Sequence, residues 1–362
     1  MRVALHVGQL LQPLPGGIGR YVWSLTANLP QVGVDVTPFA AGDIPSEWAT
    51  SLPEYRNIGW PTGPLRYELW HRLRQPVVRV ACDVIHAPSL AVPPTGRVPL
   101  VVTAHDLAFL RHPDAFTRRG VTFHRRGLAI TYQEAAIVLT ASQFAFDELV
   151  SIGFESTRIR LVPHGVAVPT TESDAAIASR LQRIGVQQPF ALFVGTLEPR
   201  KGLDTLTRAF GRVRKAHPDL SLVVVGPQGW LTVPSLEGPG IRVLGRVDEL
   251  TLDALYHRAT LCAVPSLYEG FGLPALEAMA RGCPVVASSA TSLTEVVGTS
   301  GLLVAPNDVE AWTDAIQSLL DDPTARQEFA SLGRARSQQF TWSDSAKAHA
   351  AAYEDAVEMT RP

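Results

Sequence analysis

Short apolar segments alternate with amphipathic ones along most of the chain. The apolar segments are about five or six residues long, rich in β-branched residues and apolar on both faces, as is typical of buried parallel strands. They are RVALHV, DVIHAP, LVVTAHD, AIVLTAS, IRLVPHG, FALFVGT, SLVVVG, IRVLG, TLCAVPS and CPVVASS. Helical patterns such as SQFAFDELVSIG and LDTLTRAFGRVRKAHP lie between them. This alternation predicts a doubly wound α/β architecture.

The alternation is interrupted once, by the polar segment VAVPTTESDAAIASRLQRIGVQQP. A chain of 362 residues is also long for one core, so two domains are expected. We place the junction between Pro163 and Pro169 and begin the second sheet at Phe190. The predicted parts are a first domain over 1–168, a second over 169–340, and a helix over 341–362 that packs back on the first domain. Two Rossmann-like domains facing a cleft are expected, with ligands beyond the carboxyl ends of the strands.

Composition excludes several classes of partner. The formal net charge of −2 gives no global attraction to nucleic acid or to anionic lipid, so no nucleic-acid partner is expected. The three cysteines form no CxxC pattern and indicate buried, reduced side chains. No segment approaches the ~18 uninterrupted apolar residues of a membrane-spanning helix. We expect a cytoplasmic protein.

The strongest motif is SLYEGFGLPALEAMARGCPVVAS. A strand leads into a glycine-containing loop that holds Glu269, and Pro274 suits the first helical position, with Glu277 in the opening turn. Glycines let the backbone approach a ligand, and the start of a helix offers free N–H groups and the positive end of the dipole. These features predict a diphosphate site, with Glu277 placed to bind ribose hydroxyls. The alternative is a solvated Glu269 and a Glu277 that only caps the helix.

A second motif, FALFVGTLEPRKGLDTLTRAF, places Arg200 and Lys201 where a helix begins. Two cations are badly placed beside the positive end of a helix dipole. They fit there if an anion such as a diphosphate is bound, because its negative charge offsets theirs. The alternative is a pair of exposed basic residues.

Together these motifs resemble the retaining GT-B glycosyltransferases of family 4, and weaker correspondences extend over nearly the whole chain. The resemblance implies that Glu269 contacts the donor sugar and Glu277 the ribose, while Arg200 and Lys201 hold the diphosphate. It also implies roles for backbone amides of the connecting loop. These belong to Gly270, Phe271, Gly272 and Leu273.

The resemblance adds further positions at three places in the chain. His105, in LVVTAHDLAFL, corresponds to a histidine beside the reacting sugar, and Asp106 would orient it or cap the next segment. Gly17, in QPLPGGIGRYVWSL, belongs to a glycine turn that closes over the diphosphate and acceptor; the alternative is a flexible connection. Arg246 and Val247 border the nucleotide base.

No Asp-x-Asp pair occurs in the sequence, so the usual divalent-metal clamp has no evident ligands. We expect no metal and no cofactor besides the nucleotide-sugar donor, with fixed cations in place of metal charge. The resemblance implies front-face departure, in which the leaving diphosphate takes the acceptor proton. The segment GTLEPRKGL resembles that of family members that use GDP-mannose, so GDP-mannose is the favoured donor. UDP- and dTDP-linked sugars remain alternatives.

The sequence indicates the acceptor less clearly than the donor. The segment from Arg111 to Arg126 concentrates arginines among aromatic residues. It is a candidate edge for an anionic or lipid-linked acceptor, or for peripheral contact with the inner face of a membrane. A solvated helix face is the alternative.

Three alternatives to glycosyl transfer remain compatible with the sequence. Another GT-B chemistry, such as a sugar-nucleotide epimerase or a phosphorylase, would need an acid/base pair or a lysine that carries pyridoxal phosphate. A non-catalytic sugar-nucleotide sensor would bind the donor without turnover. A nicotinamide dehydrogenase is disfavoured, because GGxG is not the spaced dinucleotide fingerprint.

Overall fold

The computed structural model describes the whole chain except residues 13–14, 46–51, 53, 171, 230–235 and 362. It divides into two compact units. The first unit comprises Met1–Pro113, Thr117–Gly165 and Trp342–Pro362, and the second Asp114–Phe116 and Val166–Thr341. The main boundary therefore follows Gly165, whereas the sequence places it after residue 168. Each unit contains one parallel sheet with helices, which confirms the predicted pair of Rossmann-like α/β domains.

The sheet of the first unit has the order β3-β2-β1-β4-β5-β6-β7, and its strands pair in parallel. Its strands are β1 (Arg2–His6), β2 (Asp35–Ala40), β3 (Arg56–Asn57), β4 (Val84–Ala87), β5 (Leu100–Thr103), β6 (Ile137–Thr140) and β7 (Ile159–Leu161). The helices of this unit are α1 (Gly16–Asn28), α3 (Gly63–Leu73), α4 (Ala108–Arg111), α5 (Arg118–Glu134), α6 (Gln143–Ser151) and α14 (Trp342–Met359). The chain reverses its direction of winding between β1 and β4, which is where ligands of such sheets bind.

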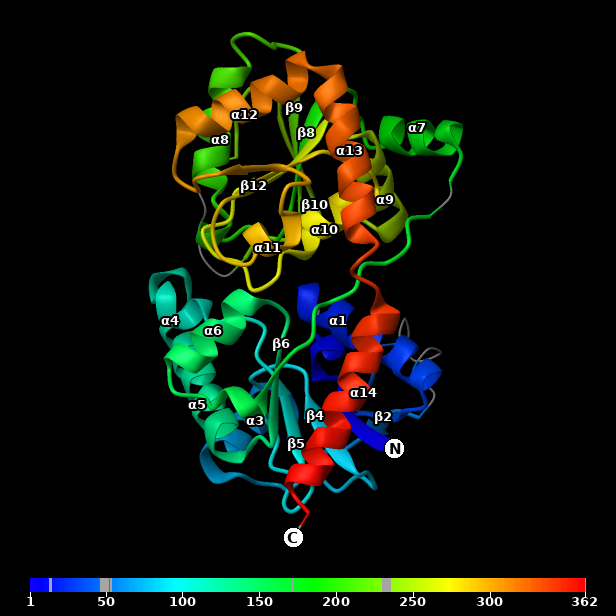
Figure 1. The fold of residues 1–362 in the computed structure, drawn as a ribbon, viewed down its shortest axis with the longest axis vertical. Coiled ribbons are helices and arrows are strands. Elements are labelled where there is room, and N and C mark those ends of the chain that lie inside the picture. The colour runs from blue at the N-terminus through cyan, green and yellow to red at the C-terminus, as the bar shows by residue number, and fades with distance from the viewer. Residues whose placement is uncertain (13–14, 46–51, 53, 171, 230–235, 362) are drawn as a thin grey trace. The chain divides into compact units, whose positions relative to one another are not determined.

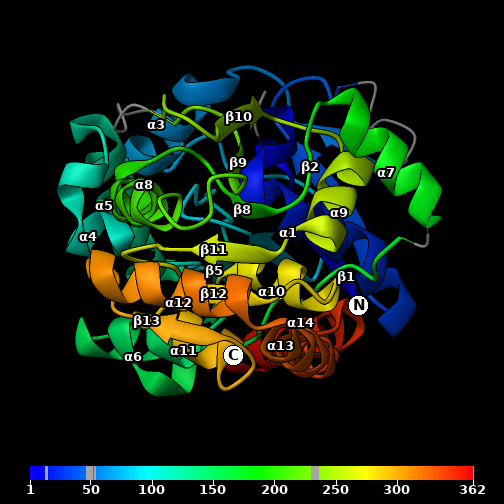
Figure 2. The same ribbon diagram turned by 90° about the horizontal axis from the view of Figure 1, so that it is seen from above.

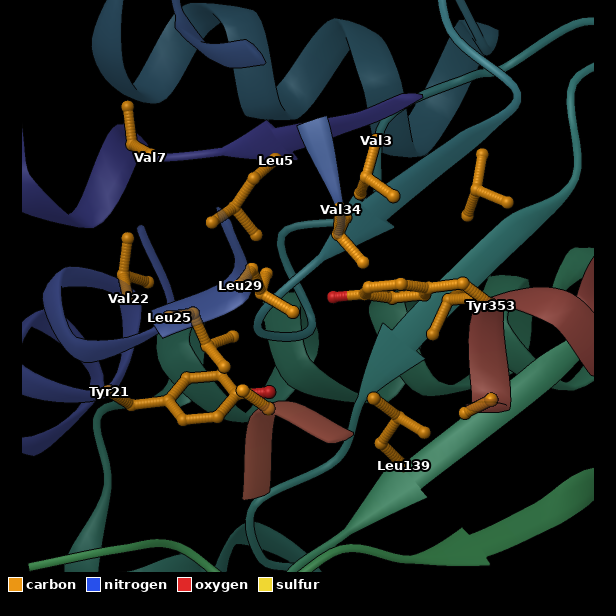
Figure 3. Close-up of a cluster of buried hydrophobic side chains, with 14 of the residues drawn as sticks. Val3, Leu5, Val7, Tyr21, Val22, Leu25, Leu29, Val34, Leu139 and Tyr353 are labelled. Carbon is orange, nitrogen blue, oxygen red and sulfur yellow. The ribbon is translucent and has the colours of Figure 1, made fainter. Parts of the chain in front are cut away.

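The C-terminal helix α14 belongs to the first unit and packs against α1 and the central strands. Figure 3 shows Tyr353 of α14 and Tyr21 of α1 among the aliphatic side chains of this core, including Val3 and Leu5 of β1. These side chains are essentially withdrawn from water, so their burial stabilises the docking of α14 by the hydrophobic effect.

The sheet of the second unit has the order β10-β9-β8-β11-β12-β13, again parallel. Its strands are β8 (Phe190–Val194), β9 (Ser221–Val225), β10 (Ile241–Gly245), β11 (Leu261–Val264), β12 (Val285–Ser288) and β13 (Leu302–Val304). Its helices are α7 (Asp174–Arg183), α8 (Leu203–Val213), α9 (Glu249–Arg258), α10 (Leu273–Ala280), α11 (Leu293–Val297), α12 (Val309–Asp321) and α13 (Pro323–Ser337). The helices α8 and α12 pack on each other, as do α10 and α13 (Figures 1 and 2). The second sheet begins at Phe190, as predicted.

Every apolar segment named above forms a strand, but β2, β3 and β13 lack that signal. The strand β2 contains Asp35, Thr37 and Pro38, and proline is usually confined to sheet edges because it cannot donate a ladder hydrogen bond. The strands β3 and β13 lie at sheet edges and are short. In the described part of the chain, no helix has both the length and the apolar character needed to cross a bilayer.

Candidate functional site

Two loops of the second unit meet at the switch point of its sheet. The strands β8 and β11 are neighbours, and the chain winds outward from them in opposite directions. A short 3-10 turn, Pro199–Lys201, follows β8, and the loop that holds Glu269 follows β11. Gly202 lies so close to this second loop that a Cβ atom there would be 2.0 Å from the carbonyl oxygen of Pro265. The fold therefore brings the two strongest sequence motifs together, where ligands of such sheets bind.

The cations of the first loop are paired with carboxylates. Lys201 Nζ lies 2.6 Å from Glu269 Oε1, and Arg200 Nε donates to Glu198 Oε2 at 2.9 Å. Arg200 also approaches Glu269 Oε2 at 3.9 Å and donates to the Tyr268 carbonyl at 3.3 Å. The exposed fractions of the Arg200 and Lys201 side chains are 14% and 11%. These residues are not the exposed basic pair of the alternative interpretation.

Glu269 is held from several sides. Ser266 Oγ donates to its carboxylate at 2.7 Å, Thr291 Oγ1 accepts from its N–H at 3.0 Å, and Ser292 Oγ donates to its carbonyl at 2.9 Å. Thr291 has φ of +57°, a left-handed conformation that a β-branched residue rarely adopts. Such strain persists where the surroundings fix the backbone, which is common at ligand sites. Glu269 is therefore a rigid buried carboxylate and not a solvated loop residue.

The two carboxyls of this cluster respond differently to burial. Burial alone would raise the pKa of Glu269, but Lys201, Arg200 and the bond from Ser266 hold its pKa below the ordinary value. Burial raises the pKa of Glu198 above its ordinary value, and the neighbouring Arg200 and Lys201 only partly oppose this. Glu269 is thus a charged hydrogen-bond acceptor at neutral pH.

The start of α10 offers backbone donors beside Glu269. Gly272 precedes the helix with φ of +103°, and a Cβ atom there would be 2.6 Å from Leu293 Cδ2. The N–H groups of Gly272 and Leu273 make no hydrogen bond within the part of the chain that the structure describes. Two of the four amides predicted to bind the diphosphate are therefore available as donors, and the partly positive helix start lies beside them.

The predicted position of Glu277 in the opening turn is wrong. The helix begins at Leu273, with Pro274 second and not first, so Glu277 lies beyond the first turn and cannot cap it. Glu277 is buried, and Tyr256 of α9 donates to its Oε2 at 3.0 Å. Arg246 and Val247 lie farther along the sheet, after the edge strand β10, with Arg246 exposed and Val247 half-buried.

His105 lies in the first unit, after β5. Its Nε2 contacts the Pro88 carbonyl at 2.8 Å, and its Nδ1 lies 3.3 Å from His164 Nε2. A carbonyl can only accept, so Nε2 of His105 carries the proton. Burial lowers the pKa of His105 and drives that of His164 well below its ordinary value, so both rings are neutral and His164 donates to His105 Nδ1. Asp106 accepts a hydrogen bond from the Ala108 N–H at 3.0 Å, at the residue where α4 begins.

A directed chain of hydrogen bonds lies next to His105. His349 Nδ1 donates to the Ser345 carbonyl, so its Nε2 accepts from Tyr21. Because the single proton of the Tyr21 hydroxyl goes to His349, Tyr21 accepts from the Thr103 hydroxyl. Thr103 in turn accepts from His86 Nε2. The other nitrogen of that ring, Nδ1, therefore accepts from Tyr353. The five distances are between 2.7 and 2.8 Å. We call these side chains the histidine–tyrosine chain; it begins and ends on α14 and crosses β4, β5 and α1. Its members are Tyr21, His86, Thr103, His349 and Tyr353.

The glycine turn expected before the first helix is not a turn. The helix α1 begins at Gly16, so Gly16, Gly17 and Gly19 form its first residues. The connection from β1 instead runs through a 3-10 turn at Gly8–Leu11. Gly17 is exposed, and a Cβ atom on Gly19 would be 2.2 Å from that of Pro15.

Some residues of the site carried no sequence signal strong enough to identify them. Glu198 lies two residues before Arg200, within the same motif, and its burial beside the cations could have been inferred from that proximity. Thr291 and Ser292 follow β12 in a segment without a motif, and only the fold places them against Glu269. In the described ranges, no group of three histidine, cysteine or acidic side chains could hold a metal ion.

Comparisons with known proteins cover most of the chain. A model described as Glycosyltransferase Family 4 matches residues 15–168, and one described as Glycosyl transferases group 1 matches residues 188–322. O-antigen chain mannosyltransferase B from Escherichia coli is 34% identical in an alignment of 294 positions that covers 76% of this chain and 76% of the relative.

Two solved structures share the fold over nearly the full length. Sucrose-phosphate synthase from Thermosynechococcus elongatus gives a TM-score of 0.77 at 24% identity, covering 98% of both chains. HepE from Anabaena, solved in complex with UDP and glucose, gives 0.75 at 21% identity, covering 97% of this chain and 98% of its own.

Proposed function

This chain belongs to the family 4, group 1 glycosyltransferases, and from that premise we propose that it transfers a hexose from a nucleotide-diphosphate sugar with retention of configuration. The proposed donor is GDP-mannose, and the acceptor is a glycan, a lipid-linked sugar or a small molecule. The similarity to an O-antigen mannosyltransferase supports the choice of sugar.

One observation carries the proposal: the cluster of Arg200, Lys201 and Glu269 at the switch point between β8 and β11. The Lys201 ammonium has three N–H donors, and among the described residues Glu269 is its one hydrogen-bond partner. Two donors thus remain for a diphosphate, in addition to the amides of Gly272 and Leu273. In this proposal Glu269 binds hydroxyls of the donor sugar and Glu277, already oriented by Tyr256, binds the ribose.

The proposed mechanism uses fixed charges in place of a metal. As the bond from the anomeric carbon to the diphosphate oxygen breaks, negative charge grows on the diphosphate, and Lys201, Arg200 and the start of α10 stabilise it. The departing diphosphate takes the proton of the acceptor hydroxyl, whose oxygen forms the new bond on the same face of the sugar. We assign to the neutral His105 a contact with the reacting sugar, and to Gly17 and the backbone at Arg246 and Val247 contacts with the diphosphate and base.

The donor is tested by a thermal-shift screen of GDP-mannose, UDP-glucose, UDP-N-acetylglucosamine and a dTDP-sugar. GDP-mannose is expected to raise Tm by about 5 °C when its concentration is about 100 times Kd. The shift is expected to disappear in Lys201→Ala and Glu277→Ala. A larger shift with UDP-glucose would overturn the choice of GDP-mannose, since HepE, a protein of the same fold, was solved with UDP and glucose.

Turnover distinguishes the proposal from its rivals. Transfer of the sugar to an acceptor with release of nucleoside diphosphate is expected of this enzyme, and it should persist in EDTA. NMR of the product should show that the anomeric configuration is retained. Binding of the donor without any turnover would favour a non-catalytic sugar-nucleotide-binding protein. Conversion of the donor into its epimer without transfer would favour an epimerase.

A lipid-linked acceptor would bring the chain to the inner face of a membrane. The segment from Arg111 to Arg126 is the proposed point of contact. Two of its arginines are engaged within the protein, since Arg111 pairs with the buried Glu148 at 2.6 Å and Arg126 with Glu68 at 3.2 Å. That leaves the start of α5 as the part able to meet a ligand.

A further inference from the structure

A large cavity lies within the first unit, along α3 and α5, which pack on each other. Its volume is about 1140 Å³, above the range of roughly 300–1,000 Å³ that is common for small-molecule sites. Its lining includes Gln9 and Gln12, which follow β1, and Pro88 and Ser89, which follow β4. The cavity therefore reaches the switch point of the first sheet, where ligands of this architecture bind.

One contact connects this cavity with His105. The carbonyl of Pro88, a lining residue, accepts the hydrogen bond from His105 Nε2 at 2.8 Å. A molecule in the cavity would thus lie one residue away from the histidine assigned to the reacting sugar. The cavity is placed to hold the acceptor.

The charge of the lining is strongly positive. Four arginines contribute to it and only one carboxylate, Glu68, which pairs with Arg72 and Arg126. Arg118 and Arg119 are exposed and make no ion pair within the described residues. His6 and His124 also line the cavity, but burial lowers the pKa of each, so neither adds to the charge. The unpaired charge is therefore concentrated at Arg118 and Arg119.

The lining also has an apolar and aromatic part. Phe123 stacks on His71 with ring centroids 4.5 Å apart and meets Tyr67 edge-on at 6.1 Å. Ile18 and Leu90 add apolar side chains to the lining. A molecule with an anionic group and a less polar body therefore matches both the cationic and the apolar part of the lining.

We propose that this cavity binds the acceptor through a phosphate or diphosphate group held by Arg118 and Arg119. Guanidinium groups favour such anions because they donate two parallel hydrogen bonds to phosphate oxygens. The proposal rests on the glycosyl transfer proposed above and adds the chemical class of the acceptor. The phosphate can belong to a lipid carrier or to a free sugar phosphate.

The test is calorimetric titration of the full chain with farnesyl diphosphate, glucose 6-phosphate and farnesol. Nucleoside diphosphate at saturation blocks the site at Lys201 during these titrations. We expect at least one phosphorylated probe to bind, and farnesol not to bind. In the double variant Arg118→Ala/Arg119→Ala that affinity should fall roughly 10- to 100-fold, as expected for two lost charge-assisted contacts.

Arg125 provides a matched control, because it is an exposed arginine of the same helix and is not part of the cavity lining. Arg125→Ala should bind the probes as the wild type does, and nucleoside diphosphate should bind all three proteins alike. Binding of farnesyl diphosphate alone would identify a lipid carrier as the source, and binding of glucose 6-phosphate alone a soluble one.

Three results would overturn the proposal: no binding of either phosphorylated probe, equal binding of farnesol, or the same loss in Arg125→Ala. If the wild type binds neither GDP nor UDP, the proposed glycosyl transfer fails instead. In that event the phosphorylated probes are titrated without nucleotide, so the two failures are distinguishable.

Discussion

At the level of single residues, charge balance decides how the cations after β8 are held. Arg200 and Lys201 are largely buried, and Glu198 and Glu269 match them one to one. Removing one member of a buried ion pair leaves its partner charged and unpaired, which costs more than the pair itself contributes. Lys201 and Glu269 should therefore act as a pair, so that the effect of replacing one on the free energy of unfolding, and on ligand binding, depends on the other.

We predict this coupling from a double-mutant cycle. Lys201→Ala and Glu269→Gln should each lower the free energy of unfolding by about 2–4 kcal/mol, because each leaves a buried partner without its counter-ion. The double variant should lose about 1–3 kcal/mol less than the sum of the two. Urea unfolding measures all four proteins. Additive losses would show that the 2.6 Å contact between Lys201 and Glu269 carries no energy.

At the level of elements, the histidine–tyrosine chain ties α14 to the first sheet. Each of its imidazoles must be neutral, with one nitrogen donating and the other accepting. Burial lowers the pKa of His349 to about 4 and drives that of His86 well below its ordinary value. Protonation of either ring would put a proton on a nitrogen that has to accept, and would break the chain.

The docking of α14 should therefore be sensitive to acid. The unfolded chain takes up a proton on His349 near pH 6.5, but the native state does so only near pH 4. The stabilisation is thus complete above about pH 6.5 and is lost as the pH falls towards 4. For this one residue the loss is about 3 kcal/mol.

Urea midpoints between pH 7.5 and pH 4.5 check this dependence. His349→Gln should reduce the acid slope by the contribution of this one ring, because His6 and His86 of the same unit also have lowered pKa values. His217→Gln should retain the slope, because His217 belongs to the second unit and pairs with the exposed Asp321. An unchanged slope in His349→Gln would contradict the assignment of a neutral ring.

At the level of the whole molecule, the sequence predicts what depends on local pattern. Buried parallel strands are apolar on both faces, so the sequence predicts β1 and β8. It does not predict β2, because that strand contains Pro38 and polar residues. The glycines at α1 predicted a turn because glycine is a poor helix former, but the 3-10 turn after β1 had already made the connection.

The candidate site was predictable in part for the same reason. Motifs after β8 and β11 meet because parallel strands end at one edge of the sheet. The anchoring of Glu269 by Thr291, and the chain that joins His86 to Tyr353, depend on contacts between distant segments, which no local pattern encodes.

The central claim is that Lys201 and the start of α10 hold a diphosphate, and calorimetric titration of GDP and UDP tests it most directly. Lys215, an exposed lysine of the same unit, provides the control. For whichever nucleotide binds, Lys201→Ala should weaken binding roughly 10- to 100-fold at a temperature where circular dichroism shows it folded, while Lys215→Ala should bind as the wild type does. Equal affinity in Lys201→Ala and the wild type would contradict the account.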